Sequence, residues 1–380
     1  MKGLLFLPLV TMITLACTEQ TDSFQPLFNG QDLTGWVPVN TAPSTWTVED
    51  GLLICSGKPM GELRTDRMYQ NFILELEWRH MIPKGNAGVF VWADDITARG
   101  VPFHRSIEVQ VLENAYGNTE SHTTHGDIFP IHGATMTPVN GRGGMRAFPT
   151  ENRAKPSPEW NHFRITANDG SISLEVNGKL VTQGIDASPR KGYICLESEG
   201  GLVHYRNIRI QELPDTPLAP SDIAIADRGL RSLYNGVDLS GWVTADSSGW
   251  TPNDWTLSFA GEPSDEPTIS TDRTFGNIAF IFDVRPREES NVAKVFLRGG
   301  AEQTAIKIDV QDPEMAEHFA EAGQWNRFEG TFRGDLLSLT LNGHKLFEDR
   351  QLAGAPETGA LTIEAAGPID FANIYVRDLK

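Results

Sequence analysis

The chain has 380 residues, and its 50 acidic against 32 basic residues give a formal net charge of -18. This charge argues against nucleic acid and anionic membrane surfaces as partners, because both attract an excess of positive charge. A hydrophobic fraction of 39% is typical of globular proteins, and the length exceeds that of one ordinary domain. We therefore expect two folded domains.

The N-terminus has the pattern of an export signal. Residues 1–16, MKGLLFLPLVTMITLA, combine one lysine, an apolar run and small residues at the end, and the run is too short to span a membrane. The stretch ITLAC resembles a bacterial lipobox, in which Cys17 is lipidated, and Thr18 in place of an aspartate then indicates the outer membrane if the host is Gram-negative. We expect a lipid-anchored protein of the outer membrane or periplasm, with residues 17–23 as a flexible tether, or else a secreted protein.

Two copies of one unit fill the rest of the chain. LFNGQDLTGW at 27–36 returns as LYNGVDLSGW at 233–242, and EWNHFRI has its counterpart in QWNRFEG. Between the copies lies the proline-rich stretch PDTPLAPSD. We predict a first domain over 24–213, a linker over 214–229 and a second, degenerate copy over 230–380.

Both copies have the pattern of short β-strands. Segments such as FILELEW, SIEVQVL and SISLEV alternate apolar and polar residues, and EVNGKL and LNGHKL place an Asn-Gly turn between two strands. One helix is expected over 313–323. The pattern predicts an all-β protein of two tandem antiparallel β-sandwiches. Tryptophans that recur in both copies are expected in the cores: Trp36, Trp46, Trp160, Trp242, Trp255 and Trp325.

Two cysteines remain beyond Cys17. Cys55 and Cys195 both lie in apolar, strand-like runs. They either pair as a disulfide in an oxidising compartment or remain two buried free thiols. Neither spacing indicates a metal site.

The first copy carries an insertion over 115–155. From Asn114 to Trp160 is 46 positions, but from Pro313 to Trp325 is 12, which leaves 34 extra residues. The insertion holds SHTTHGDIFPIHGATM, with three of the nine histidines of the chain. Because it directly follows a predicted strand, we expect it to form one wall of an active site.

The strand before the insertion carries polar residues on one face. Glu108 and Gln110 occupy alternate positions and so share a face, and Glu113 lies just beyond the strand end. In the second copy we align these residues with Lys307, Asp309 and Asp312. A chemical role would not tolerate that change, which favours the first copy as the catalytic one.

FQPLFNGQDLTGW, YQNFILELEWR, IEVQVLEN and HYRNIRIQEL resemble the successive signatures of the 3-keto-disaccharide hydrolase domain family. The resemblance covers roughly residues 24–213 and, less faithfully, 230–380. It implies a jelly roll similar to concanavalin and laminin-G domains, and cleavage of glycosides already oxidised to a ketone at C3. Where family members carry an arginine this chain has Trp92, so we expect Trp92 to stack on the sugar.

A ketone at C3 acidifies the hydrogen on C2, so a base can remove that proton and the enolate can expel the C1 substituent. Such a site needs a base, a cation or electrophile at the ketone oxygen and an acid for the leaving oxygen. Histidine and glutamate suit proton transfer near neutral pH. Catalytic candidates are Glu108, Glu113, His125 and His132. Substrate-binding candidates are Gln110, Trp92, His104, Arg142 and Arg146.

The histidine-rich stretch can also supply metal ligands. His122, His125 and His132 with Asp127 offer donors for one divalent first-row metal, although the spacing matches no named zinc motif. The alternative is that these histidines are loop residues without a ligand. His80 and His162 are expected to be structural.

Three functions stay open, all with a carbohydrate as partner. The leading hypothesis is an exported enzyme acting on 3-keto-glycosides, by lyase chemistry or net hydrolysis. The alternative is a non-catalytic surface carbohydrate-binding protein, which would need aromatic residues and amides but no clustered titratable groups. A conventional glycoside hydrolase would need paired carboxylates, for which Glu108 and Glu113 are the candidates.

Overall fold

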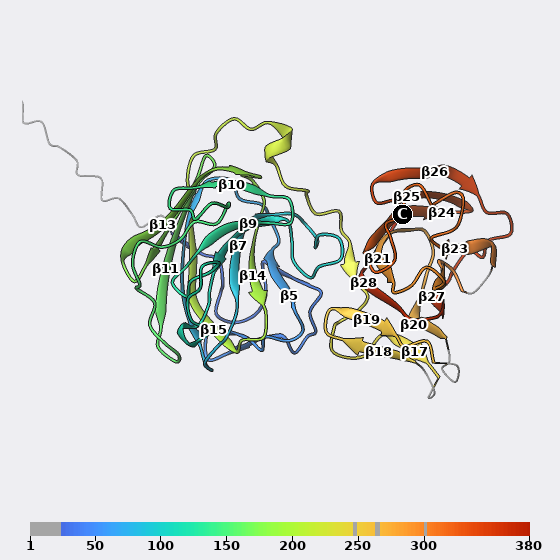
Figure 1. Cartoon of the computed structure of the whole chain (residues 1–380), viewed down its shortest axis with the longest axis horizontal. Helices are drawn as coiled ribbons and strands as arrows, with labels where there is room; N and C mark the ends of the chain where they lie inside the picture. The colour runs from blue at the N-terminus through green and yellow to red at the C-terminus, as the bar shows by residue number, and fades with distance from the viewer. Residues whose placement is uncertain (1–23, 246–248, 263–266, 300–301) are drawn as a thin grey trace, which may run out of the picture.

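The computed structural model describes residues 24–245, 249–262, 267–299 and 302–380. Within these ranges the regular structure is β, apart from three single 3-10 turns at Asn114–Tyr116, Pro220–Asp222 and Glu302–Thr304. Strands β1–β15 form a first sandwich and β16–β28 a second beside it (Figure 1). The predicted all-β fold of two antiparallel sandwiches is confirmed.

The predicted export signal, the predicted tether and the predicted lipidation site Cys17 lie outside the described residues. No helix in the described part of the chain is long and apolar enough to cross a membrane.

The first sandwich packs a nine-stranded sheet on a six-stranded sheet. The nine-stranded sheet has the order β10-β13-β12-β11-β6-β15-β4-β3, with β1 also paired to β15, and the six-stranded sheet has the order β2-β5-β14-β7-β8-β9. The strands of the larger sheet are β1 (Gln25–Pro26), β3 (Trp46–Glu49), β4 (Leu52–Cys55), β6 (Phe72–His80), β10 (Thr135–Pro138), β11 (Asn161–Asn168), β12 (Ser171–Val176), β13 (Lys179–Ser188) and β15 (Val203–Glu212). Those of the smaller sheet are β2 (Trp36–Val39), β5 (Gly61–Thr65), β7 (Gly88–Ala93), β8 (Ser106–Gln110), β9 (Ile128–Ile131) and β14 (Tyr193–Ser198).

The second sandwich repeats this plan with an eight-stranded and a five-stranded sheet. Their orders are β18-β19-β28-β21-β24-β25-β26, with β16 paired to β28, and β17-β20-β27-β22-β23. The eight strands are β16 (Arg231–Ser232), β18 (Trp250–Asn253), β19 (Thr256–Phe259), β21 (Ile278–Pro286), β24 (Asn326–Arg333), β25 (Leu336–Leu341), β26 (His344–Gln351) and β28 (Ile369–Asp378). The five are β17 (Trp242–Thr244), β20 (Thr268–Phe275), β22 (Val292–Phe296), β23 (Ala305–Ile308) and β27 (Gly359–Ala366).

The insertion in the first copy adds one strand to each sheet. β9 extends the six-stranded sheet beyond β8, and β10 extends the nine-stranded sheet beyond β13. The corresponding sheets of the second sandwich end one strand earlier, at β23 and β26. The histidine-rich stretch therefore leads from β8, which carries Glu108 and Gln110, into β9, which pairs with β8.

Alternation along the strands separates the core from the outer face of the six-stranded sheet. Ile107 and Val109 of β8 pack in the core between the sheets. Ser106, Glu108 and Gln110 take the alternate positions and therefore lie on the opposite face, yet all three are buried. Burial of polar side chains on an outward face shows that loops cover it.

Strand pairing corrects the alignment of the two copies. Val89 pairs with Val109 in the first sandwich, and its counterpart Val295 pairs with Ile306 in the second. Glu108 therefore corresponds to Ala305 and not to Lys307, so the expected alignment was wrong by two residues. A shift of two keeps every side chain on the same face, so the alternation of the sequence could not reveal it.

Two smaller expectations were also wrong. Residues 313–323 form turns and no helix, because the backbone hydrogen bonds to the carbonyl groups of Asp312 and Met315 are not continued into a regular ladder. Among the recurring tryptophans, Trp36, Trp46 and Trp242 are buried as expected, but Trp160, Trp255 and Trp325 are only half-buried. The ring of Trp160 lies under the guanidinium groups of Arg79 and Arg206, which keep it at the surface of the sheet.

The two sandwiches pack directly on one another. Nδ2 of Asn40 donates to Oδ1 of Asn373 over 2.7 Å, and the backbone N–H of Gly100 donates to Oδ2 of Asp283 over 2.8 Å. An apolar cluster across the contact comprises Val39, Ile96, Leu230, Ile281 and Tyr375. The second sandwich therefore holds the loop between β7 and β8, residues 94–105, which leads into Glu108.

Candidate active site

Four glutamates gather on the outward face of the six-stranded sheet. Glu62 comes from β5, Glu197 from β14 and Glu108 from β8, and Glu199 follows directly after β14. Glu62, Glu197 and Glu108 are 0%, 1% and 6% exposed, and Glu199 is half-buried. We call these four residues the carboxyl cluster. Three of its members are withdrawn from water, and Glu199 is the most exposed.

Gly88 on β7 leaves the space in which two of these carboxyl groups meet. A Cβ atom on Gly88 would lie 2.9 Å from Oε2 of Glu197 and 3.1 Å from Oε1 of Glu108. Any side chain here would therefore displace both groups. The equivalent residue of the second sandwich is Lys294, which lies 3.9 Å from Glu364, the counterpart of Glu197. The close approach of two carboxyl groups over a glycine is thus a feature of the first sandwich, and the equivalent place in the second is taken by Lys294.

Burial and mutual repulsion raise the pKa values of three members of the carboxyl cluster, Glu108, Glu197 and Glu199. Loss of hydration is the main cause that raises the pKa of Glu108, and the charge of Glu199 adds to it. Burial, followed by the charge of Glu108, likewise raises the pKa of Glu197. Burial raises the pKa of Glu199 to about 7, against hydrogen bonds from Glu197 and Asn86 that lower it. Glu199 can therefore accept or release a proton near neutral pH, beside Glu108 and Glu197, in which burial favours the protonated form.

Arg146 brings a positive charge to the cluster from the insertion. Its guanidinium donates to Oδ2 of Asp127 over 2.9 Å and to Oε1 of Gln110 over 3.4 Å, and it lies 3.3 Å from the ring centre of Phe129. Nε2 of Gln110 in turn donates to Oδ1 of Asn86 over 3.0 Å, and Asn86 donates to Glu199. A continuous polar chain thus runs from Arg146 to the most exposed member of the cluster.

His104 lies at the far side of the cluster, next to Glu62 and Cys195. Its Nδ1 is 2.9 Å from Oε2 of Glu62 and 3.3 Å from Sγ of Cys195, and all three side chains are fully buried. The three donor atoms lie close enough together to hold a metal ion. Cys195 is a free thiol, as is Cys55 on the opposite sheet, so the disulfide alternative is wrong.

Several predicted site residues meet on the outward face of the six-stranded sheet. Glu108, Gln110 and Arg146 belong to it, and His104 adjoins it through Glu62. His132 lies at its rim, exposed, with its ring stacked 6.4 Å from that of Phe103.

His125 is buried in the insertion loop. Its Nε2 contacts Nδ2 of Asn118 at 3.1 Å and its Nδ1 contacts Oγ1 of Thr124 at 3.1 Å, so loop partners occupy both ring nitrogens. Burial lowers the pKa of His125 and keeps the ring neutral.

Glu113 and Arg142 are not brought to the cluster. The carboxylate of Glu113 accepts backbone N–H groups of Lys84 and Ala115 at 2.8 Å and of Ser157 at 3.1 Å, so it ties three loop segments together. Arg142 donates to the carbonyl oxygen of Thr119 over 3.0 Å. Both residues organise the insertion instead of facing a ligand.

Trp92 cannot stack on a sugar, so that expectation was wrong. Its side chain is 0% exposed, and its indole N–H donates to the carbonyl oxygen of Gln70 over 2.8 Å. β7 carries a β-bulge here: Phe90 pairs with Cys195 and Ala93 with Tyr193, and Trp92 has a φ of 55°. The extra residue turns the indole into the core.

The predicted metal ligands of the insertion do not converge. Nδ1 of His122 contacts Oγ1 of Thr119 at 2.9 Å. The carboxylate of Asp127 accepts hydrogen bonds from the backbone N–H of Thr123 and from the guanidinium of Arg146. Across the described residues, the only group of three or more possible ligands is Glu62, His104 and Cys195.

Sequence reasoning missed Glu62, Glu197 and Glu199. Each stands in a strand-like stretch, GELRT or CLESE, where an acid alternates with apolar residues. A search for acids on the outward positions of consecutive predicted strands would have found them. Their convergence depends on the pairing of β5, β14 and β7, which are far apart in the chain.

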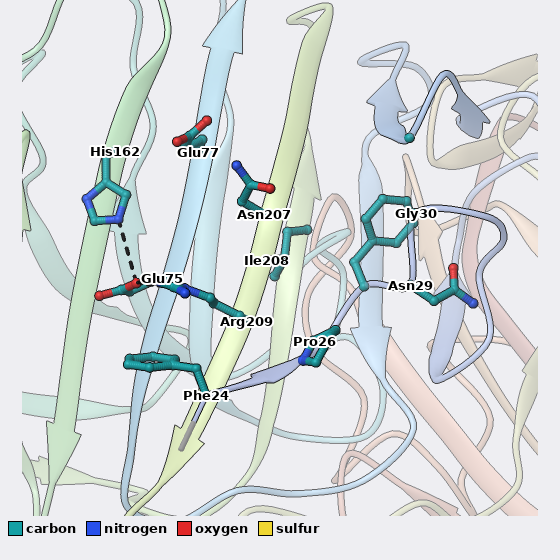
Figure 2. Close-up of a pocket in the computed structure, with 12 residues that line it drawn as sticks. Phe24, Pro26, Asn29, Gly30, Glu75, Glu77, His162, Asn207, Ile208 and Arg209 are labelled. Carbon is teal, nitrogen blue, oxygen red and sulfur yellow. Dashed lines mark hydrogen bonds and ion pairs between the residues drawn. The ribbon is translucent and has the colours of Figure 1, made fainter. Parts of the chain in front are cut away.

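A cavity of about 640 Å³ lies on the outer face of the nine-stranded sheet. Figure 2 shows Glu75 there between His162 and Arg209. Burial acts to raise the pKa of Glu75, but hydrogen bonds from Arg209 and Arg164 outweigh it, so the pKa is lowered. A carboxylate that is paired in this way offers no proton, so the carboxyl cluster is the better candidate active site. His162 is half-buried here, 3.9 Å from Glu75.

His80 is structural, as expected. It is buried, and its Nε2 lies 2.7 Å from the carbonyl oxygen of Val111.

Comparisons with known proteins match residues 23–211 and 229–377 to the 3-keto-alpha-glucoside-1,2-lyase-like domain. The chain is 25% identical over 254 residues to a 3-keto-disaccharide hydrolase of Bacteroides thetaiotaomicron, covering 53% of this chain and 82% of that protein. A crystal structure of a proposed glycosyl hydrolase of Parabacteroides distasonis is 21% identical, with 50% of this chain and 94% of that chain covered and a TM-score of 0.39. A Bacillus subtilis protein with a galectin-like fold is 12% identical, with 50% and 94% covered and a TM-score of 0.38. Since the family match takes in nearly all strands of both sandwiches, the chain belongs to the family of the 3-keto-alpha-glucoside-1,2-lyase-like domain.

Proposed function

We propose that the first sandwich cleaves glycosides that carry a ketone at C3, by elimination across C1 and C2. The observation that carries this proposal is the carboxyl cluster above Gly88, where Glu199, with a pKa raised to about 7, lies beside Glu108, whose pKa is raised by burial. Family membership and the 3-keto-disaccharide hydrolase relative support a substrate of this class.

Glu199 is the proposed base, because its pKa of about 7 and partial exposure let it accept a proton from bound substrate. It removes the hydrogen from C2, and the electron pair forms the enolate of the C3 ketone. Arg146 and Gln110 stabilise the developing oxyanion, since a positioned cation and amide favour that charge in a site with little water.

Glu108 is the proposed acid. Burial keeps its carboxyl protonated, so it can donate to the glycosidic oxygen as the C1–O bond breaks. The enolate returns to the ketone, a C1=C2 double bond forms, and the alcohol leaves with the proton of Glu108. Addition of water to that double bond would complete a net hydrolysis.

Turnover of matched substrates tests this assignment. The purified protein is incubated with a glycoside and with its 3-keto form, and release of the alcohol is followed. We expect turnover of the 3-keto form only, and a loss of about 100-fold or more in kcat for Glu108→Gln and Glu199→Gln. The matched control is Glu364→Gln, at the equivalent of Glu197 in the second sandwich, which should leave kcat unchanged.

Two outcomes would contradict the proposal. Binding of the 3-keto-glycoside without turnover would indicate a carbohydrate-binding protein. Equal turnover of the unoxidised glycoside would indicate conventional hydrolysis.

We further propose that the enzyme works outside the cytoplasm, on a lipid anchor at Cys17. The sequence pattern of residues 1–17 supports this. Labelling of the expressed protein with a radioactive fatty acid should be lost in Cys17→Ala, and labelling of both proteins alike would contradict the anchor.

A further inference from the structure

We propose that Glu62, His104 and Cys195 form a zinc site on the outward face of the six-stranded sheet of the first sandwich. This proposal does not depend on the proposed function. The donors come from β5, from the loop before β8 and from β14, and their ligand atoms lie within 4.8 Å of one another. All three side chains are completely buried, which distinguishes them from the common exposed clusters of acids.

Unpartnered polar atoms point to a missing occupant. One carboxylate oxygen of Glu62, Oε1, accepts the backbone N–H of His104 over 2.8 Å. The other, Oε2, has only the two other proposed ligands as polar neighbours in the described part of the chain: Nδ1 of His104, at 2.9 Å, and the thiol of Cys195. A buried carboxylate oxygen that lacks a hydrogen bond costs free energy, and a bound cation would offset this cost.

The arrangement does not fit a nucleophilic triad. A cysteine, histidine and acid relay needs the thiol at one ring nitrogen and the carboxylate at the other. Here both lie at Nδ1, while Nε2 of His104 has no hydrogen-bond partner in the described part of the chain.

Ligand chemistry favours zinc. Thiolate and imidazole select a borderline-soft ion, and Glu62 with the Cys195 thiolate balances two positive charges. In tetrahedral zinc sites, nitrogen and oxygen ligands are about 3.4 Å apart and nitrogen and sulfur ligands about 3.6 Å. The observed separations of 2.9 Å and 3.3 Å are shorter than these by about half an ångström or less, so the three ligands would move slightly apart on binding. On binding, the thiol proton leaves to solvent and the imidazole keeps its proton on Nε2.

The second sandwich lacks these ligands. Strand pairing places Thr268 at the position of Glu62 and Thr362 at that of Cys195. We therefore expect one metal ion per chain. It would join β5, β14 and the loop before β8, the elements that carry Glu62, Glu197 and Glu108.

Metal content of the full chain tests the site. The protein is purified without chelator, equilibrated with zinc and desalted, and zinc is measured by mass spectrometry. A second sample is refolded with cobalt, because a cobalt–thiolate bond gives a charge-transfer band in the near ultraviolet. We expect about one zinc per chain and this band in the wild type.

Two matched cysteine variants identify the ligand. Cys195→Ser should lose the cobalt band, and Cys55→Ser, which removes the buried free thiol of the other sheet, should keep it. Zinc well below one per chain with no cobalt band in the wild type would overturn the proposal, as would a band that survives in Cys195→Ser. Because the wild-type measurement needs no variant, poor folding of Cys195→Ser leaves the test decisive.

Discussion

Replacing Glu199 with glutamine should change how stability depends on pH. Burial raises the pKa of this carboxyl from 4.5 to about 7 in the folded protein. Between these two values the folded state holds a proton that the unfolded chain has released, so the free energy of unfolding falls as pH rises. At about 1.4 kcal/mol per pKa unit, the loss amounts to about 3 kcal/mol above pH 7 and vanishes below about pH 4.5. Glutamine needs no proton and avoids this loss.

The free energy of unfolding of Glu199→Gln and wild type is compared by urea denaturation at about pH 5 and about pH 8. From about pH 5 to about pH 8, the free energy of unfolding of the variant should rise by up to about 3 kcal/mol relative to that of wild type. The rise is smaller if Glu197 takes up the proton that Glu199 no longer binds.

The control is Glu113→Gln. Its pKa is lowered, because backbone hydrogen bonds outweigh burial, so its contribution to stability is fully present above pH 4.5 and is lost only in stronger acid. This variant should be destabilised equally at both pH values. A Glu199→Gln variant whose stability relative to wild type stays constant or falls from pH 5 to pH 8 would refute the reasoning.

Three further substitutions probe the surroundings of the site. Gly88→Ala should push apart Glu197 and Glu108 and lower kcat on a 3-keto-glycoside by about 100-fold, and unchanged kcat would show that their spacing is not critical. Asp283→Ala leaves the guanidinium of Arg327 in the second sandwich without its buried partner and the N–H of Gly100 in the first without its acceptor. It should cost about 3–5 kcal/mol, seen as a lower melting temperature, and an unchanged value would show that this network contributes little to stability. Trp92→Ala should cost about 3–5 kcal/mol in urea denaturation, whereas a stacking residue would lose substrate affinity at little cost in stability.

The fold was predictable because its signals are local. Alternation and Asn-Gly turns mark strands wherever a sheet has one buried face, so the sandwiches followed from the sequence. The same alternation placed Glu108 and Gln110 on one face of β8, and the structure places them in one polar network with Arg146. The insertion also lies beside that strand, as expected, but through a strand pairing with β8 that the sequence did not indicate.

The rest of the site was not predictable because it depends on strand order and on backbone irregularities. Glu62 and Glu197 meet only because β5 pairs with β14, and such pairings leave no mark in either segment. The β-bulge that buries Trp92 adds one residue without changing the apolar character of β7. Glu113 looked titratable, but the backbone N–H groups that bind it cannot be read from side-chain spacing.

The central claim is that the carboxyl cluster removes a proton from C2. A 3-keto-glycoside deuterated at C2 tests it most directly, with the deuterium content of the released sugar measured by mass spectrometry and corrected for exchange without enzyme. We predict that wild type releases sugar without deuterium at C2. The Glu199→Gln variant should release almost no sugar. Rapid release of sugar that keeps its deuterium would contradict the elimination and the role of Glu199.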